Sequence, residues 1–345
     1  MTRRGSFGWG EVWALLLVLP ALAFSACASE LPPEPALTAD PPRGAGSVAA
    51  DGAAQTEIDR GVAFVKNEKY AEAKEHFYNA IAVKPSAEAW TYVGVTAEKT
   101  GNRGAAEDAY KSALKLDPSF VEAAQNLSAL YLDDPARPDD AIALLKVALE
   151  KSPGTPRLLQ NLGFAYGLKG DVEGAGRAYE ASVAKGEDAH VRFAYGTLLF
   201  EKKQPEKAAE QLKKALAAAQ DDAPLLVSVG RLLGGTKAFG DCVTAFDRAL
   251  KIKATDAEWF VRRGTCKHEL KDEEGAEQDF KAAVKVDPTF AAARYYLGLS
   301  LLAQKKRLAA ITELEKAGQL GGDGPIGKSA RAKFDELTKQ TKKKK

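Results

Sequence analysis

The chain has 345 residues, of which 28% are charged and 45% are hydrophobic, and its formal net charge is +2. A charge this close to neutral produces no strong positive field, so the composition argues against a nucleic-acid partner. Beyond residue 24, no apolar run is long enough to cross a bilayer.

Residues 1–26 have the features of a secretory signal peptide. Arg3 and Arg4 provide a positive start, and an apolar stretch over residues 12–24 is followed by small residues. This pattern predicts export from the cytoplasm.

The end of the signal resembles the bacterial lipoprotein cleavage box. Cys27 directly follows Phe24, Ser25 and Ala26. The resemblance implies that Cys27 becomes a lipidated N-terminus, and that Ala28, in place of an aspartate, favours the outer membrane. The alternative is ordinary signal cleavage nearby, which would leave a soluble periplasmic protein.

Residues 27–53 are rich in Pro, Ala, Gly, Asp and Glu and contain few large apolar side chains. Such a segment buries too little surface to fold, and its prolines keep it extended. We predict a disordered tether.

A glycine, replaced once by serine, recurs every 33 to 35 residues across residues 54–322. A small residue follows most of these glycines after twelve positions and a large one after sixteen, as Ala276 and Phe280 follow Gly264. Each unit predicts two closely approaching helices joined by a polar turn, because small residues leave room for the facing helix. The series is Gly61, Gly94, Ser128, Gly163, Gly196, Gly230, Gly264 and Gly298.

Helical pairs with a period near 34 resemble the tetratricopeptide repeat family. The resemblance implies an all-α fold, a right-handed superhelical solenoid of about eight helical hairpins over residues 54–322. One hairpin cannot bury its own apolar face, so neighbouring hairpins must stack. Residues 323–341 are amphipathic and predict a capping helix, and residues 342–345 form a lysine tail.

Two units depart from the pattern. In the third, Ser128 takes the place of glycine and a longer turn over residues 133–140 shifts the small residue to Ala141. In the sixth, Gly234 and Gly235 are predicted to lie in the turn and to weaken it locally.

No motif in the chain indicates chemistry. The three histidines, His76, His190 and His268, have no second ligand at metal-binding spacing. Phosphate-binding loops and nucleophile elbows are also missing from the sequence. We therefore predict no metal, no cofactor, no small-molecule substrate and no enzymatic activity.

Cys242 takes the small-residue position in the second helix of the sixth unit, and Cys266 lies two residues past the glycine of the seventh. Their helices are neighbours in a solenoid. Two interpretations stay open: a disulfide, which the periplasm permits, or two buried thiols.

In this family, the first helix of each hairpin lines a concave groove. By resemblance, groove positions lie six and three residues before the glycine, and one, four and five residues after it. These offsets predict a partner-binding groove formed by Gln125, Gln160, Phe164, Leu168, His190, Phe193, Thr197, Phe200, Val227, Arg231, Val261, His268, Tyr295 and Leu299.

Together these features predict a lipid-anchored scaffold of the outer membrane that faces the periplasm. Its groove would hold a peptide, helix or domain of another protein during assembly of an envelope complex. Pilus or secretin assembly, outer-membrane protein insertion and cell-wall synthesis use repeats of this kind. The alternative is a soluble periplasmic module, without the anchor, that regulates or senses a ligand.

Overall fold

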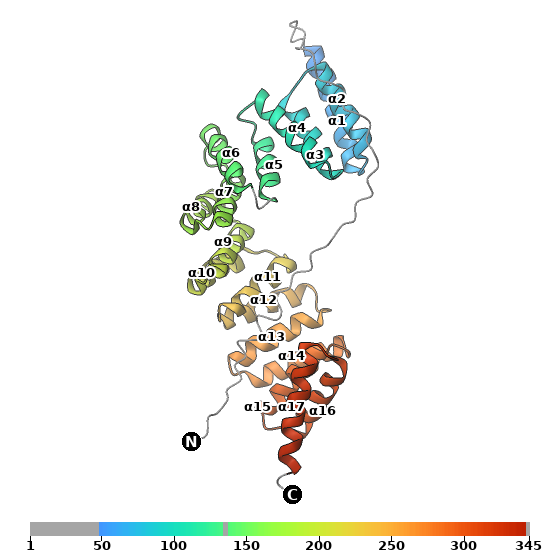
Figure 1. Ribbon diagram of the computed structural model, residues 1–345, viewed down its shortest axis with the longest axis vertical. Helices are drawn as coiled ribbons and strands as arrows, with labels where there is room; N and C mark the ends of the chain where they lie inside the picture. The colour runs from blue at the N-terminus through green and yellow to red at the C-terminus, as the bar shows by residue number, and fades with distance from the viewer. Residues whose placement is uncertain (1–47, 134–136, 343–345) are drawn as a thin grey trace. The chain divides into compact units, whose positions relative to one another are not determined.

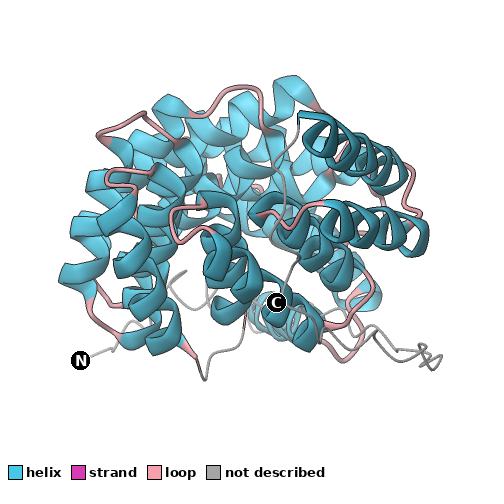
Figure 2. Ribbon diagram, turned by 90° about the horizontal axis from the view of Figure 1, so that it is seen from above, coloured by secondary structure: helices cyan, strands magenta, loops and turns pink. Residues whose placement is uncertain are grey.

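The structure, a computed structural model, describes residues 48–133 and 137–342. The predicted signal peptide, Cys27 and most of the predicted tether lie outside these residues. Residues Ala53–Lys345 form one compact unit, which contains all of the helical array except the first residues of its first helix. The described residues form helices joined by short loops, without any strand (Figures 1 and 2).

Sixteen of the seventeen described helices form eight consecutive hairpins (Figure 1). The first helices are α1 (Val48–Lys66), α3 (Ala87–Lys99), α5 (Val121–Leu132), α7 (Pro156–Lys169), α9 (Ala189–Glu201), α11 (Ala223–Gly235), α13 (Ala257–Glu269) and α15 (Ala291–Ala303). The second helices are α2 (Tyr70–Val83), α4 (Arg103–Leu116), α6 (Pro138–Lys151), α8 (Val172–Val183), α10 (Pro205–Ala218), α12 (Phe239–Ile252), α14 (Glu273–Val286) and α16 (Arg307–Leu320). The last hairpin is followed by α17 (Pro325–Lys342).

Each hairpin packs on the next one. The second helix of a hairpin packs against the first helix of its successor, and first helices such as α5 and α7 also contact one another. At the end of the array, α17 packs on α16 and α15. The described chain is therefore the predicted all-α solenoid, and its first helices form a continuous row.

The repeated glycines mark the closest approach of the two helices in a hairpin. A Cβ atom on Gly264 would lie 2.7 Å from Cε1 of Phe280, and one on Gly230 would lie 2.9 Å from Cε2 of Phe246. Both rings are fully buried. No larger residue fits at these positions without separating the helices, since protein interiors are packed to near-crystalline density.

The same rings also reach the following hairpin. The ring of Phe77 stacks on Tyr92 at 5.0 Å between centroids, and Phe280 stacks on Tyr296 at 5.8 Å. The large residue of each repeat thus joins packing within its hairpin to packing between hairpins.

The turns of seven hairpins share one left-handed residue, seven positions past the repeated glycine. Glycine occupies this position in two turns, as Gly101 and Gly170 with φ of 78° and 80°. Five other turns place a residue with a Cβ there, at φ between 59° and 68°: Glu68, Lys203, Lys237, Lys271 and Lys305. Such residues bear a steric cost that glycine avoids.

Three predicted boundaries change. Helix α1 begins at Val48, inside the predicted tether, because its first residues are alanine-rich and contain no proline. The closing helix spans Pro325–Lys342 in place of 323–341 and takes in the first lysine of the predicted tail. Gly234 and Gly235 are the last residues of α11, not part of the turn.

Cys242 and Cys266 are joined by a disulfide, with Cα atoms 6.3 Å apart. Both side chains are fully buried. The bond connects α12 to α13 and therefore the sixth hairpin to the seventh.

Lys271→Gly is expected to raise the free energy of unfolding by about 1 kcal/mol, because glycine adopts positive φ without a Cβ clash. Urea denaturation followed by circular dichroism measures this change. Lys281→Gly is the matched control: Lys281 is an exposed lysine inside α14, where glycine should lower stability by about 1 kcal/mol. A loss of stability in Lys271→Gly would show that the turn does not strain its lysine.

Replacing both cysteines by alanine is expected to lower the free energy of unfolding by about 3 kcal/mol, because the bond restricts the unfolded chain over a separation of 24 residues. Thermal unfolding of the oxidised chain, the reduced chain and the Cys242→Ala/Cys266→Ala variant measures it. The reduced wild type should unfold near the double variant. Equal melting temperatures for the oxidised and reduced chains would contradict this prediction.

Candidate protein-binding face

Two apolar side chains of the predicted groove stand on α7, the first helix of the fourth hairpin. Phe164 is 48% exposed and Leu168 is 42% exposed. They are four residues apart and therefore lie on the same side of the helix. Large apolar side chains this exposed are available to a partner.

Helix α9 continues this surface with Phe193, Thr197 and Phe200, which are spaced at helical intervals and half-buried. Thr197 Oγ1 donates a hydrogen bond to the carbonyl oxygen of Phe193 at 2.8 Å, so its hydroxyl group is satisfied within the helix. The ring of Phe200 reaches the next first helix, where a Cβ on Gly235 would lie 2.9 Å from its Cζ.

Gly235 was not predicted as a site residue, although its absent side chain provides the space for Phe200. The signal in the sequence is the pair Gly234-Gly235 at the end of a first helix, which no other unit has. Within this pair, Gly235 leaves the space that the Phe200 ring of α9 occupies.

Helix α11 contributes Val227 and Arg231, both half-buried and one helical turn apart. Burial, and then the neighbouring Arg262, lowers the pKa of Arg231 below its usual range. We define the central patch as the apolar residues of these three helices, Phe164, Leu168, Phe193, Phe200 and Val227.

Polar residues border the central patch. Gln125 and Gln160 are half-buried on α5 and α7. The exposed His190 on α9 has its Nε2 atom 3.3 Å from Oδ2 of Asp222. An apolar centre with a polar rim is the usual composition of a protein interface.

The remaining predicted residues differ in accessibility. Val261 is 3% exposed and His268 is 8% exposed, so neither is open to a partner. His268 instead lies with Nδ1 2.8 Å from Oε2 of Glu273. Tyr295 and Leu299 are half-buried on α15, and burial raises the pKa of Tyr295.

Neither a metal site nor a membrane span is found among the described residues. Within 48–133 and 137–342, no group of three or more His, Cys, Asp or Glu side chains could hold a metal ion. None of the described helices combines the length and the apolar character needed to cross a membrane.

The repeats match the tetratricopeptide repeat family over residues 58–119, 94–156, 165–223 and 269–325. These matches cover more than half of the sequence. The chain therefore belongs to the tetratricopeptide repeat family, whose members bind peptides or proteins.

A curated relative is the E3 ubiquitin-protein ligase CHIP of Arabidopsis thaliana, which is 28% identical over 102 residues, or 29% of this chain. The chain matches 37% of the length of that protein.

Solved structures are also similar to this chain. MamA is 20% identical with a TM-score of 0.42 and covers 48% of this chain and 91% of its own. TTC0263 of Thermus thermophilus is 23% identical with a TM-score of 0.44, and the match covers 52% of this chain and 99% of TTC0263. YrrB, described as a TPR protein with an unusual peptide-binding site, is 19% identical with a TM-score of 0.44. The match covers 66% of this chain and 99% of YrrB.

Proposed function

We propose that this chain is a non-enzymatic scaffold of the cell envelope that holds another protein on its central patch. The observation that carries the proposal is the exposure of Phe164 and Leu168 beside the half-buried Phe193. A partner that covered these side chains would remove apolar surface from water at little cost in ordering, because the helices beneath are already packed.

The shape of the central patch suits a helix or an extended peptide. Its residues come from α7, α9 and α11, so a partner would lie across three first helices. Aromatic anchors with a polar surround are typical of binding hot spots, and Gln160 and His190 provide polar groups at the border. The ligase activity in the name of the Arabidopsis relative is not part of the proposal, since the match covers 37% of that protein.

The proposed location is the periplasmic side of the outer membrane. Three features support it: the signal-like residues 1–26, the lipoprotein-like cysteine at Cys27, and the Cys242–Cys266 disulfide. Disulfides persist in oxidising compartments and are rare in the cytosol. A tethered solenoid there would bring a partner into an envelope assembly, such as pilus or secretin, outer-membrane or cell-wall machinery.

Phe164→Ser/Leu168→Ser is expected to weaken partner binding by about 2 kcal/mol or more, near 30-fold, while leaving helical content unchanged. Both side chains are largely exposed, so their loss costs little stability. Proteins cross-linked to the full chain in the native envelope, quantified by mass spectrometry for wild type and variant, measure the effect. Phe193→Ala/Phe200→Ala should act in the same direction with some loss of stability, because those rings are half-buried.

Phe280→Ala is the control for folding. Its ring is fully buried, so truncation should cost about 3–5 kcal/mol of stability. If the Phe164→Ser/Leu168→Ser variant retained the same cross-linked proteins in the same amounts, the central patch would not be the binding face.

Cys27→Ala is expected to move the protein from the membrane fraction to the soluble periplasm and to abolish metabolic labelling with a fatty acid. Stable anchoring needs more than one acyl chain, because each buried CH₂ contributes only about 0.8 kcal/mol. Cys242→Ala is the matched cysteine control and should leave both labelling and fractionation unchanged. Wild-type protein found wholly in the soluble periplasm would contradict the anchor.

A further inference from the structure

The third hairpin packs differently from the others. Ser128 fills the glycine position, and its hydroxyl donates to the carbonyl oxygen of Gln125 at 2.9 Å and accepts from Nδ2 of Asn161 at 2.9 Å. The large residue Leu145 lies seventeen positions past Ser128, one more than in the other repeats. Helices α5 and α6 are also in less extensive contact with each other than α3 and α4 are.

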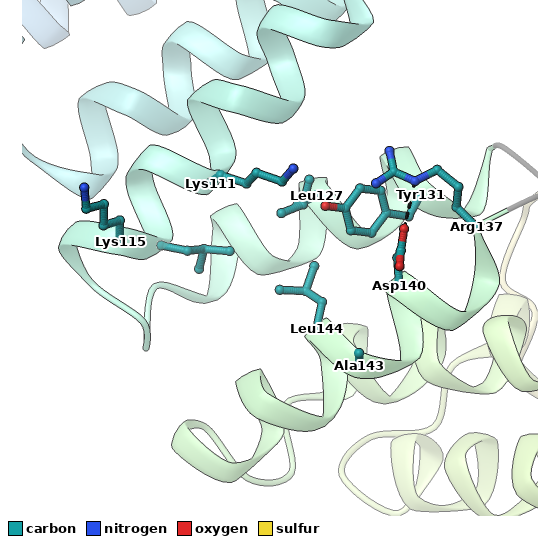
Figure 3. A pocket seen from close by; sticks show the side chains of 9 residues that line it. Lys111, Lys115, Leu127, Tyr131, Arg137, Asp140, Ala143 and Leu144 are labelled. Atoms are coloured by element: carbon teal, nitrogen blue, oxygen red, sulfur yellow. Dashed lines mark hydrogen bonds and ion pairs between the residues drawn. The ribbon is translucent and has the colours of Figure 1, made fainter. Parts of the chain in front are cut away.

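A pocket of about 540 Å³ lies between α4 and α6, with α5 beneath it (Figure 3). Its apolar lining includes Leu114 from α4, Leu127 from α5 and Leu144 from α6. Leu127 is buried, whereas Leu114 and Leu144 are half-buried and face the space. We name this site the outer pocket, because second helices form its walls.

A network of polar contacts holds one wall of the outer pocket. The guanidinium group of Arg137 lies 4.1 Å from the centre of the Tyr131 ring. Its Nη1 and Nη2 atoms donate to Glu107 at 2.5 and 3.0 Å. Its Nε atom donates to Asp140 at 3.0 Å (Figure 3). The hydrogen bonds from Arg137, more than those from Lys111, lower the pKa of Glu107 to about 2. This wall is therefore built before any ligand arrives.

The charges around the outer pocket do not balance. Lys111 pairs with Glu107 at 2.6 Å, and Arg137 pairs with Glu107 and Asp140. Lys115, at the α4 side, is exposed and forms no ion pair with the residues that the structure describes. The cations Lys111, Lys115 and Arg137 outnumber the carboxylates Glu107 and Asp140 by one, and the positive charge left over is that of Lys115 at the α4 end of the pocket.

We propose that the outer pocket docks a segment of a partner protein in which a Leu, Ile or Phe side chain stands beside an Asp or Glu. The apolar side chain would contact Leu114, Leu127 and Leu144, and the carboxylate would meet the ammonium group of Lys115. Because Lys111, Lys115 and Ala143 are exposed along the pocket, a small ligand would stay wet there, whereas a protein segment covers the opening. This surface is separate from the central patch, which lies on first helices.

Selection of phage-displayed random dodecapeptides on the immobilised full chain tests the proposal. We expect enrichment of sequences with Asp or Glu within two residues of Leu, Ile or Phe. By fluorescence anisotropy, Lys115→Glu should weaken the selected peptides about tenfold by reversing the charge at the opening. Leu144→Ser should also weaken them. Lys146→Glu, the same change at an exposed lysine of α6 outside the pocket, should leave their affinity unchanged.

The central-patch variant Phe164→Ser/Leu168→Ser separates the two surfaces. We expect the selected peptides to bind this variant as tightly as wild type while losing affinity for Lys115→Glu, which together assign them to the outer pocket. Peptides that lose affinity for the central-patch variant would belong to the central patch, and the outer-pocket proposal would fail while the proposed scaffold function stood. Absence of acidic and apolar enrichment, or equal affinity for Lys115→Glu, would also overturn it. Dodecanoate binding that depends on Lys115, without any selected peptide, would assign the pocket to a small amphiphile instead.

Discussion

The contact between a glycine on the first helix and a large side chain on the second is the constraint on which the array depends. Gly264 and Phe280 leave no space for a Cβ atom, so their helices cross at a fixed close distance. The ring of Phe280 then extends to Tyr296 in the next hairpin. One small residue therefore fixes both the hairpin and its stacking, and repeating it every 34 residues or so builds the solenoid.

This division of roles leaves the first helices free to vary. Packing buries the sides of a first helix that meet its own hairpin and its neighbours, while Phe164 and Leu168 on α7 remain 48% and 42% exposed. The exposed face of each first helix can thus change sequence without disturbing the fold. A protein-binding surface arises on this face because the repeat places no structural demand on it.

The fold could be predicted from the sequence because each repeated glycine and large residue marks where the two helices of a hairpin approach each other. The candidate site could be predicted only in part. Val261 and Phe193 stand three residues before their glycines, yet Val261 is buried and Phe193 is half-buried. The offset specifies the direction in which a side chain points, whereas its exposure depends on the size of residues in neighbouring hairpins. Gly235 was not predicted for the same reason, because its role depends on the ring of Phe200, which belongs to the preceding hairpin.

Two units depart from the repeat pattern, and the structure of each could not be predicted from the period alone. Cys242 stands where other repeats have buried alanines, so the sequence alone left both a disulfide and two thiols open. A disulfide requires the two Cα atoms to lie within bonding reach, and here they are 6.3 Å apart. That distance is set by packing between the two hairpins. At the third hairpin, Ser128 takes the place of the glycine and the outer pocket lies alongside. One departure adds a covalent link between the sixth and seventh hairpins, and the other accompanies the pocket for which we propose a ligand.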